Sequence, residues 1–165
     1  MTKSIAPQTT LIDVKHLATT EVIASALLES AGRLALIDPG PTSCLGNLEA
    51  GLGALGLSVR DLDMILLTHI HLDHAGATGT LVRKNPSLQI VVHERGTPHL
   101  VDPSRLIKSA TRVFGSEMER MWGNFESVPS DRITSLQGGE TVTLGDRKLE
   151  VIYTPGHASH HVSYF

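Results

Sequence analysis

Four side chains of metal-binding type lie within six residues of one another near the middle of the chain: His69, His71, Asp73 and His74. They directly follow the apolar run Met64-Ile-Leu-Leu67. In an extended strand, residues two positions apart point to the same side, so His69 and His71 project together. The small residues that come next allow the backbone to turn and begin a helix. A strand that runs into such a loop presents all four side chains to one small volume, which predicts a site for one or two metal ions.

A second candidate segment lies at the far end of the chain. Thr154-Pro-Gly-His157 follows a predicted strand, so His157 arrives at a strand end as His69 does. His160 and His161 come directly afterwards. A third strand ends at Asp38, and carboxylates at strand ends often contribute to sites. A turn aspartate that bonds its own backbone is an equal alternative for Asp38.

These segments resemble the metallo-β-lactamase superfamily. Thr68-His-Ile-His-Leu-Asp-His74 is similar to the family's His-x-His-x-Asp-His signature, and Thr154-Pro-Gly-His157 is similar to its next ligand segment. Shorter similarities lie at Leu36-Ile-Asp-Pro-Gly40 and Gly139-Glu140. The stretch from Thr154 to Phe165 looks like the Thr-Pro-x-His-Thr-x-Gly-His segment of the glyoxalase II branch, with His160 in place of the usual glycine.

The resemblance implies roles for individual residues. A first ion would be held by His69, His71 and His157, which leave a fourth position for water, and a second ion by Asp73 and His74. Asp73 would also have the catalytic role of orienting a metal-bridging hydroxide, the nucleophile. Asp38, Thr68 and His161 would orient ligands without binding the ion. The expected metal is zinc, one or two ions per chain, with iron or manganese as alternatives.

The family's bridging aspartate and the second ion's last histidine lie beyond the second motif, where this sequence supplies no residues. His160 or His161 as a substitute ligand is the less favoured alternative. We therefore expect an α/β fold, a metallo-β-lactamase-like αββα sandwich, represented by its first half and the start of its second. Exposed apolar strands associate, so we expect the 165 residues alone to be oligomeric, aggregated or weakly folded.

Hydrophobic patterning predicts one domain over residues 1–165 in which strands and helices alternate. The predicted strands are Thr9–Val14, Val22–Leu28, Arg33–Ile37, Met64–Leu67, Leu88–Val92, Arg132–Leu136, Thr141–Leu144, Arg147–Tyr153 and Val162–Phe165. The strands over 132–153 are separated by glycine-containing turn dipeptides, which indicate an antiparallel meander. One helix is predicted after a cap at Thr42 or Ser43, and a short one over Gly79–Lys84. No motif surrounds His16.

Residues 97–130 are predicted to form a helical insertion. Asp102-Pro103 begins one helix, and Ser116-Glu-Met-Glu119 reads as a capping box for a second. This pair either packs on the sheet as ordinary amphipathic helices or caps the metal cleft. The cap is slightly favoured, because the family places its variable insertions between the two ligand motifs. A substrate pocket would then be lined by Met118, Met121, Trp122 and Phe125, adaptable apolar side chains.

Composition limits the classes of function. Fourteen basic and 17 acidic residues give a net charge of −3, which offers no electrostatic footprint for nucleic acid. No segment reaches the roughly 20 apolar residues of a membrane span, and no signal peptide is recognised, so we expect a cytoplasmic protein without a membrane partner. Cys44 is the single cysteine, which excludes an intramolecular disulfide.

The expected function is metal-dependent hydrolysis of a small-molecule ester, thioester or lactone. One alternative is a mononuclear iron enzyme resembling persulfide dioxygenases, which use a similar histidine motif. The other is a non-catalytic half-domain.

Overall fold

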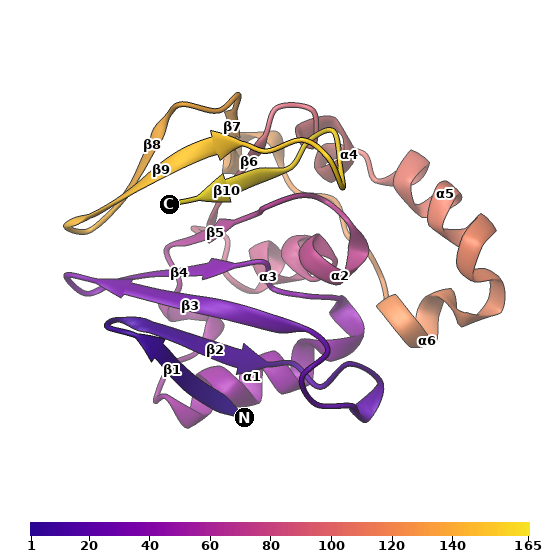
Figure 1. The fold of residues 1–165 in the computed structure, drawn as a ribbon. Coiled ribbons are helices and arrows are strands. Elements are labelled where there is room, and N and C mark those ends of the chain that lie inside the picture. Colours follow the sequence, from indigo (N-terminus) through magenta and orange to yellow (C-terminus); the bar gives the residue numbers. More distant parts are fainter.

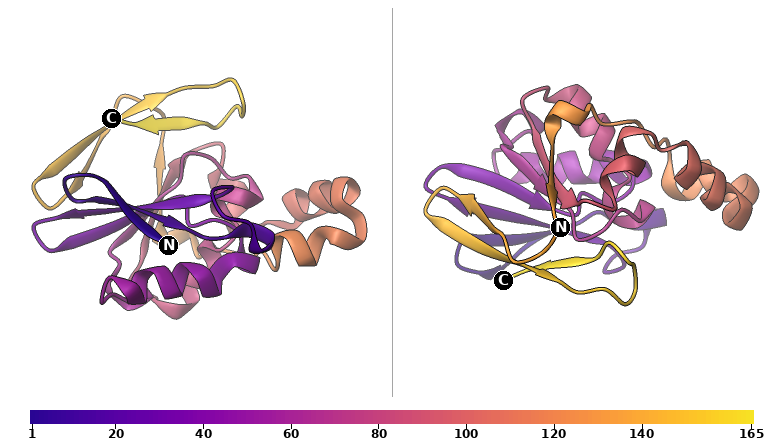
Figure 2. Two further views of the ribbon diagram at one scale, coloured as in Figure 1. Left: turned by 60° about the horizontal axis from the view of Figure 1, so that its bottom comes forward. Right: turned by 90° about the horizontal axis from the view of Figure 1, so that it is seen from above.

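The computed structural model describes residues 1–165 and contains two β-sheets that face each other (Figures 1 and 2). The larger sheet has seven strands in chain order: β1 (Thr2–Ala6), β2 (Thr9–Asp13), β3 (Ala24–Ser30), β4 (Arg33–Ile37), β5 (Met64–Leu66), β6 (Gln89–His93) and β7 (Ile133–Leu136). Strands β1 to β4 are antiparallel, and β4 to β7 are parallel. The smaller sheet is antiparallel and contains β8 (Thr141–Leu144), β9 (Arg147–Tyr153) and β10 (Val162–Tyr164).

Six α-helices connect or follow the parallel strands: α1 (Leu45–Ala54), α2 (Leu72–Ala75), α3 (Thr78–Lys84), α4 (Thr97–Val101), α5 (Ser104–Phe114) and α6 (Met118–Trp122). Five 3₁₀ turns complete the chain: η1 (His16–Ala18), η2 (Thr42–Cys44), η3 (Val59–Asp61), η4 (Gly115–Glu117) and η5 (Ser130–Arg132). Helices α1 and α3 cover the face of the large sheet opposite the small sheet (Figure 2). No helix is both long and apolar enough to cross a membrane.

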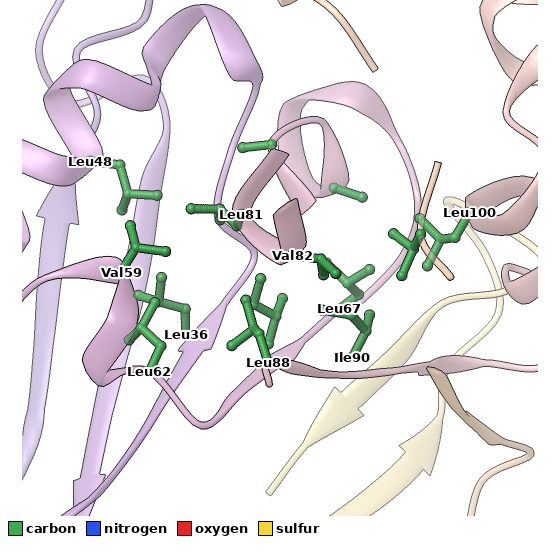
Figure 3. Close-up of a cluster of buried hydrophobic side chains, with 14 of the residues drawn as sticks. Leu36, Leu48, Val59, Leu62, Leu67, Leu81, Val82, Leu88, Ile90 and Leu100 are labelled. Atoms are coloured by element: carbon green, nitrogen blue, oxygen red, sulfur yellow. The ribbon is translucent and has the colours of Figure 1, made fainter. Parts of the chain in front are cut away.

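The central strands are apolar on both faces because both faces are covered. Successive residues of a strand point to opposite sides, so Leu36, Ile65 and Ile90 pack under the helices in the larger core, part of which is shown in Figure 3. Their neighbours Leu66 and Val91 pack against the small sheet in a second core. Helix, large sheet and small sheet thus form three layers, and the mixed α/β class of the predicted sandwich is confirmed.

Helices α5 and α6 form an arm, residues 104–122, that extends away from the sheets (Figures 1 and 2). Ala110 is the only buried residue of α5, and α6 has none.

Several local predictions were wrong. Strand β7 does not begin an antiparallel meander; it pairs in parallel with β6 and completes the large sheet. Strand β1 was not predicted, and β3 begins at Ala24 rather than Val22. Thr42 and Ser43 do not cap α1, because their hydroxyls donate to the carbonyls of Gly76 and Met121.

The capping box expected at Ser116 is also absent. That residue lies in η4, and α6 begins at Met118 without a side-chain cap.

Candidate metal centre

The loop after β5 carries most of the candidate ligands. Strand β5 lies between β4 and β6, and its extension is fixed by hydrogen bonds from the Leu67 amide to Val91 and from the Asp38 amide to Leu66. His69 follows this strand, and His71 precedes α2 in extended backbone, with φ −62° and ψ 154°. Helix α2 then carries Asp73 and His74. Four potential ligands therefore lie on a rigid strand end and a single helical turn.

Three histidines from two sheets meet at this loop. The candidate ligand atoms of His69, His71 and His157 all lie within 4.8 Å of one another. Nδ1 of His71 and Nε2 of His157 are 3.0 Å apart. Two nitrogens that bind one tetrahedral zinc at about 2.05 Å are about 3.3 Å apart, so this spacing is close to that of a shared ion.

A chain of hydrogen bonds fixes the tautomer of His69. Asp38 accepts from the Thr68 amide at 2.8 Å and from the Thr68 hydroxyl at 2.6 Å. Thr68 Oγ1 also lies 3.0 Å from Nδ1 of His69. Because the hydroxyl has a single proton and gives it to Asp38, Nδ1 of His69 must be the donor in this second bond. Nε2 of His69 is left with a free lone pair, the form in which imidazole binds a metal.

The environment of His69 fits a metal ligand. Its Nε2 is buried and has no hydrogen-bond partner, although buried polar atoms are nearly always paired. Burial and the surrounding imidazoles lower the pKa of His69 to about 3, so it stays neutral, as a ligand must. Burial and His157 likewise lower the pKa of His71. The donor set, three imidazoles that include the unpaired Nε2 of His69, suits zinc.

His74 lies between two carboxylates. Its Nδ1 is 2.8 Å from Asp38 and its Nε2 is 3.3 Å from Asp73. Burial opposes a charge on this ring, but the hydrogen bonds to Asp38 and Asp73 outweigh it and raise the pKa of His74 to about 9. In the metal-free protein the His74 ring is therefore protonated at neutral pH.

Asp38 comes as close to His69 and His74 as a ligand would. Its carboxylate, however, accepts hydrogen bonds from Thr68 and His74, so we interpret it as the residue that orients both histidines.

His160 and His161 lie next to the triad without joining it. The ring centre of His161 is 5.2 Å from that of His69, and its Nδ1 lies 2.8 Å from the Thr154 hydroxyl. The ring centre of His160 is 5.8 Å from that of His71, and its Nδ1 is buried without a partner. Neither belongs to a group whose ligand atoms converge within 4.8 Å.

An apolar groove of about 470 Å³ opens beside the triad, between α2 and the arm. Trp122 lines it, together with Leu72, Leu106, Ala110, Val113 and Phe114; His71, Asp73 and His157 also line it and bring it to the candidate metal centre.

Of the four predicted pocket residues, only Trp122 lies in this groove. Met118 and Phe125 line a different hollow on the arm, and Phe125 is buried in the larger core. The Met121 carbonyl accepts hydrogen bonds from His16 and Ser43. Most of the rest of the groove wall comes from α5, the first helix of the pair for which a cap was slightly favoured over packing on the sheet.

Sequence analysis missed a network that holds the His157 loop. Arg95 donates to the Tyr153 hydroxyl at 3.0 Å and to the Ser159 carbonyl at 3.3 Å, and Tyr153 donates to the same carbonyl. His93 stacks on Tyr153, with ring centres 4.8 Å apart. Arg95 and His93 lie 58 or more positions away from the residues they contact, Tyr153 and Ser159, so no local pattern marks these contacts; an arginine shortly after a buried strand was the available signal.

Fold and site together define an α/β sandwich domain with a histidine-rich metal-binding loop. The family model of the metallo-beta-lactamase superfamily matches residues 18–165. A metallo-beta-lactamase fold-containing protein from Sulfurisphaera tokodaii is 34% identical over 106 residues, which are 62% of this chain and 40% of that protein. The chain therefore belongs to the metallo-beta-lactamase superfamily.

Solved structures share the fold of this chain. BJP-1, a subclass B3 metallo-beta-lactamase of Bradyrhizobium japonicum, superposes with a TM-score of 0.75 and 26% identity, over 99% of this chain and 55% of its own. A metallo-beta-lactamase with a HARLDQ motif from Cronobacter sakazakii has a TM-score of 0.73 at 21% identity, over 99% of this chain and 58% of its own. The chain thus spans about half the length of the relatives it matches.

Proposed function

We propose that this chain forms the metal centre of a hydrolase for small esters, thioesters or lactones that uses one or two zinc ions. The observation that carries the proposal is the convergence of His69, His71 and His157 within 4.8 Å, where two of them, His71 and His157, line an apolar groove. The similarity of Thr154-Pro-Gly-His157 and the following histidines to the glyoxalase II segment favours that branch.

The three histidines would hold the first ion, and Asp73 with Nε2 of His74 would hold the second. Bound zinc would supply a Lewis acid that polarises a carbonyl and lowers the pKa of water towards about 7, so that hydroxide would be available at neutral pH. Asp38 and Thr68 keep the Nε2 lone pair of His69 directed into the site. Asp38 does the same for His74 by accepting from its Nδ1.

Asp73 is the residue best placed to orient the attacking water. Burial would raise its pKa, but the hydrogen bond from His74 outweighs this and keeps the pKa of Asp73 below its ordinary value. The side chain is therefore an acceptor at neutral pH, and it lines the groove beside His71 and His157. A carboxylate oxygen there accepts a hydrogen bond from the water and directs the water's lone pair towards the substrate carbonyl.

The groove favours a substrate with an uncharged apolar group next to the scissile carbonyl. Apart from Asp73, His71 and His157, its lining contains one polar residue, Ser109, and no charged one.

The test combines metal analysis with a substrate panel. The purified protein is assayed for zinc, iron and manganese, and for hydrolysis of 4-nitrophenyl esters, an acyl thioester, a lactone and a cephalosporin, because the solved relatives are beta-lactamases. We expect about one to two equivalents of zinc and acyl hydrolysis that a chelator abolishes. His71→Ala should lose the activity, whereas His99→Ala, a partly exposed histidine on α4, should keep it. Protein that stays metal-free after zinc loading would refute the proposal.

A further inference from the structure

His16 is a buried histidine that the metal centre does not use. Its exposed fraction is 7%, although it lies in η1, a turn whose other side chains, Leu17 and Ala18, are exposed. Its Nε2 lies 2.8 Å from the carbonyl oxygen of Met121, a residue 105 positions further along the chain. A carbonyl oxygen only accepts, so His16 is the donor.

The same carbonyl of α6 is held from a second side. Ser43 in η2 donates to the Met121 carbonyl at 2.7 Å. The next turn comes so close that a Cβ at Gly123 would lie 2.8 Å from the Ser43 amide nitrogen. The end of the arm is therefore attached to the body of the protein through η1 and η2.

The ring of His16 also fixes a wall of the groove. It stacks on Trp122 with ring centres 5.0 Å apart and an interplanar angle of 16°. Phe114 contacts Trp122 in a T-shaped arrangement, with ring centres 5.2 Å apart and an interplanar angle of 68°. Nε1 of Trp122 is buried without a hydrogen-bond partner, so ring packing rather than its own hydrogen bond determines where the indole lies.

The backbone around His16 is strained in a way that serves this contact. Lys15, Leu17 and Ala18 have φ values of 50°, 51° and 63°, the left-handed region that residues with a Cβ seldom adopt. Such a conformation persists only where surrounding contacts over-determine it, and here it directs the His16 ring inward while its neighbours point to solvent.

We propose that His16 is a positioning residue for substrate selection. By donating to Met121 and stacking on Trp122, it sets the distance between the arm and the metal-binding loop, and with it the size of apolar acyl group that the groove admits. The selection of acyl groups rests on the proposed function, whereas the positioning of Trp122 by His16 does not.

Trp122 is the only tryptophan, so its fluorescence reports the contact without any assay of activity. In His16→Ala, we expect the emission to shift to longer wavelength and acrylamide to quench it more strongly, at unchanged zinc content. His16→Gln keeps a donor for the Met121 carbonyl, so its emission wavelength and its quenching should lie between those of the wild type and of His16→Ala. Thr19→Ala, an exposed side chain in the same segment, is the matched control and should match the wild type.

The kinetic measurement compares 4-nitrophenyl octanoate with 4-nitrophenyl acetate. Loss of an aromatic stacking contact should change the ratio of kcat/KM for the two esters at least about threefold in His16→Ala, mainly through KM for the octanoyl ester. Unchanged Trp122 fluorescence in His16→Ala would overturn the inference. Altered fluorescence with an unchanged ester ratio would overturn the role in selection.

Two further outcomes are decisive. If the zinc-loaded wild type hydrolyses no ester, thioester or lactone of the panel, the proposed function fails, and the fluorescence result alone decides whether His16 positions Trp122. If His16→Ala does not fold, Ser43→Ala removes the other donor to Met121 and should shift the emission in the same direction by a smaller amount; an unshifted emission would overturn the inference.

Discussion

At the scale of single residues, Asp38 connects both parts of the candidate site. It orients His69 through Thr68 and His74 directly. Its φ of 50° lies in the left-handed region, which aspartate and asparagine tolerate better than other residues with a Cβ. Asparagine at this position thus preserves the backbone and removes only the carboxylate.

Asp38→Asn should therefore weaken zinc binding by about 10- to 100-fold, the usual effect of losing a hydrogen bond that orients a ligand. Competition with a chromophoric chelator measures the Kd. Asp131→Asn, an exposed carboxylate in η5, is the control. An unchanged Kd in Asp38→Asn would show that Thr68 orients His69 unaided.

Asp73→Asn separates catalysis from the first metal ion. Because Asp73 is not part of the histidine triad, we expect turnover to fall at least about 100-fold while the Kd for the first zinc changes less than about threefold. Steady-state kinetics and zinc titration on one preparation measure both quantities. Equal losses would contradict the division of roles between Asp73 and the triad.

The raised pKa of His74 predicts a pH dependence for the metal-free protein. Its folded pKa of about 9 lies above the ordinary 6.5, so the protonated ring stabilises the fold fully below pH 6.5, and this contribution is lost as pH rises through 9. Since the side chain is 33% exposed, the effect is on the order of 1–2 kcal/mol after solvent screening. Urea unfolding of chelator-treated protein from pH 6 to 10 should show this fall in the wild type and His99→Gln, and a flatter profile in His74→Gln.

At the scale of elements, two helical glycines have opposite surroundings. A Cβ at Gly79 in α3 would lie 2.1 Å from the Glu126 carbonyl oxygen, whereas a Cβ at Gly53 in α1 would meet nothing within 4 Å. Gly79→Ala should destabilise the protein by about 2–3 kcal/mol, because backbone must move. Gly53→Ala should stabilise it by about 0.5 kcal/mol through helix propensity. Chemical denaturation tests both; a neutral Gly79→Ala would show that the segment after the arm yields easily.

The sequence predicted the elements whose signal is local. The apolar run at Met64 followed by ligand-type residues indicated β5 and its loop, because strand end and ligands adjoin in the chain. Strand β7 was wrongly predicted to join an antiparallel meander. Its parallel partner β6 lies about 40 residues earlier in the chain, and the turn residues that flank β7 do not indicate such a pairing. Thr42 and Ser43 looked like caps because their type favours caps, but tertiary acceptors at Gly76 and Met121 took their hydroxyls.

At the scale of the whole molecule, the candidate site lies where the two sheets meet at one end. His69 and His71 follow β5 of the large sheet, and His157 follows β9 of the small sheet. The sheets are otherwise joined by the second core, where Leu66 packs with Val151. No pattern in the sequence predicts this meeting beyond the family resemblance, since 86 residues separate His71 from His157.

An ion held by both sheets also acts as a removable cross-link. Only the folded chain brings the three imidazoles together, so binding adds RT ln(1 + [L]/Kd) to the free energy of unfolding, about 4 kcal/mol at a thousandfold excess over Kd. This added free energy opposes motions that separate the two sheets. Zinc should therefore slow hydrogen–deuterium exchange at the amides of β9 and β10 and leave β1, at the opposite edge, nearly unaffected. Equal protection of all three strands would show that the ion stabilises the large sheet as a whole instead of fastening the small sheet to it.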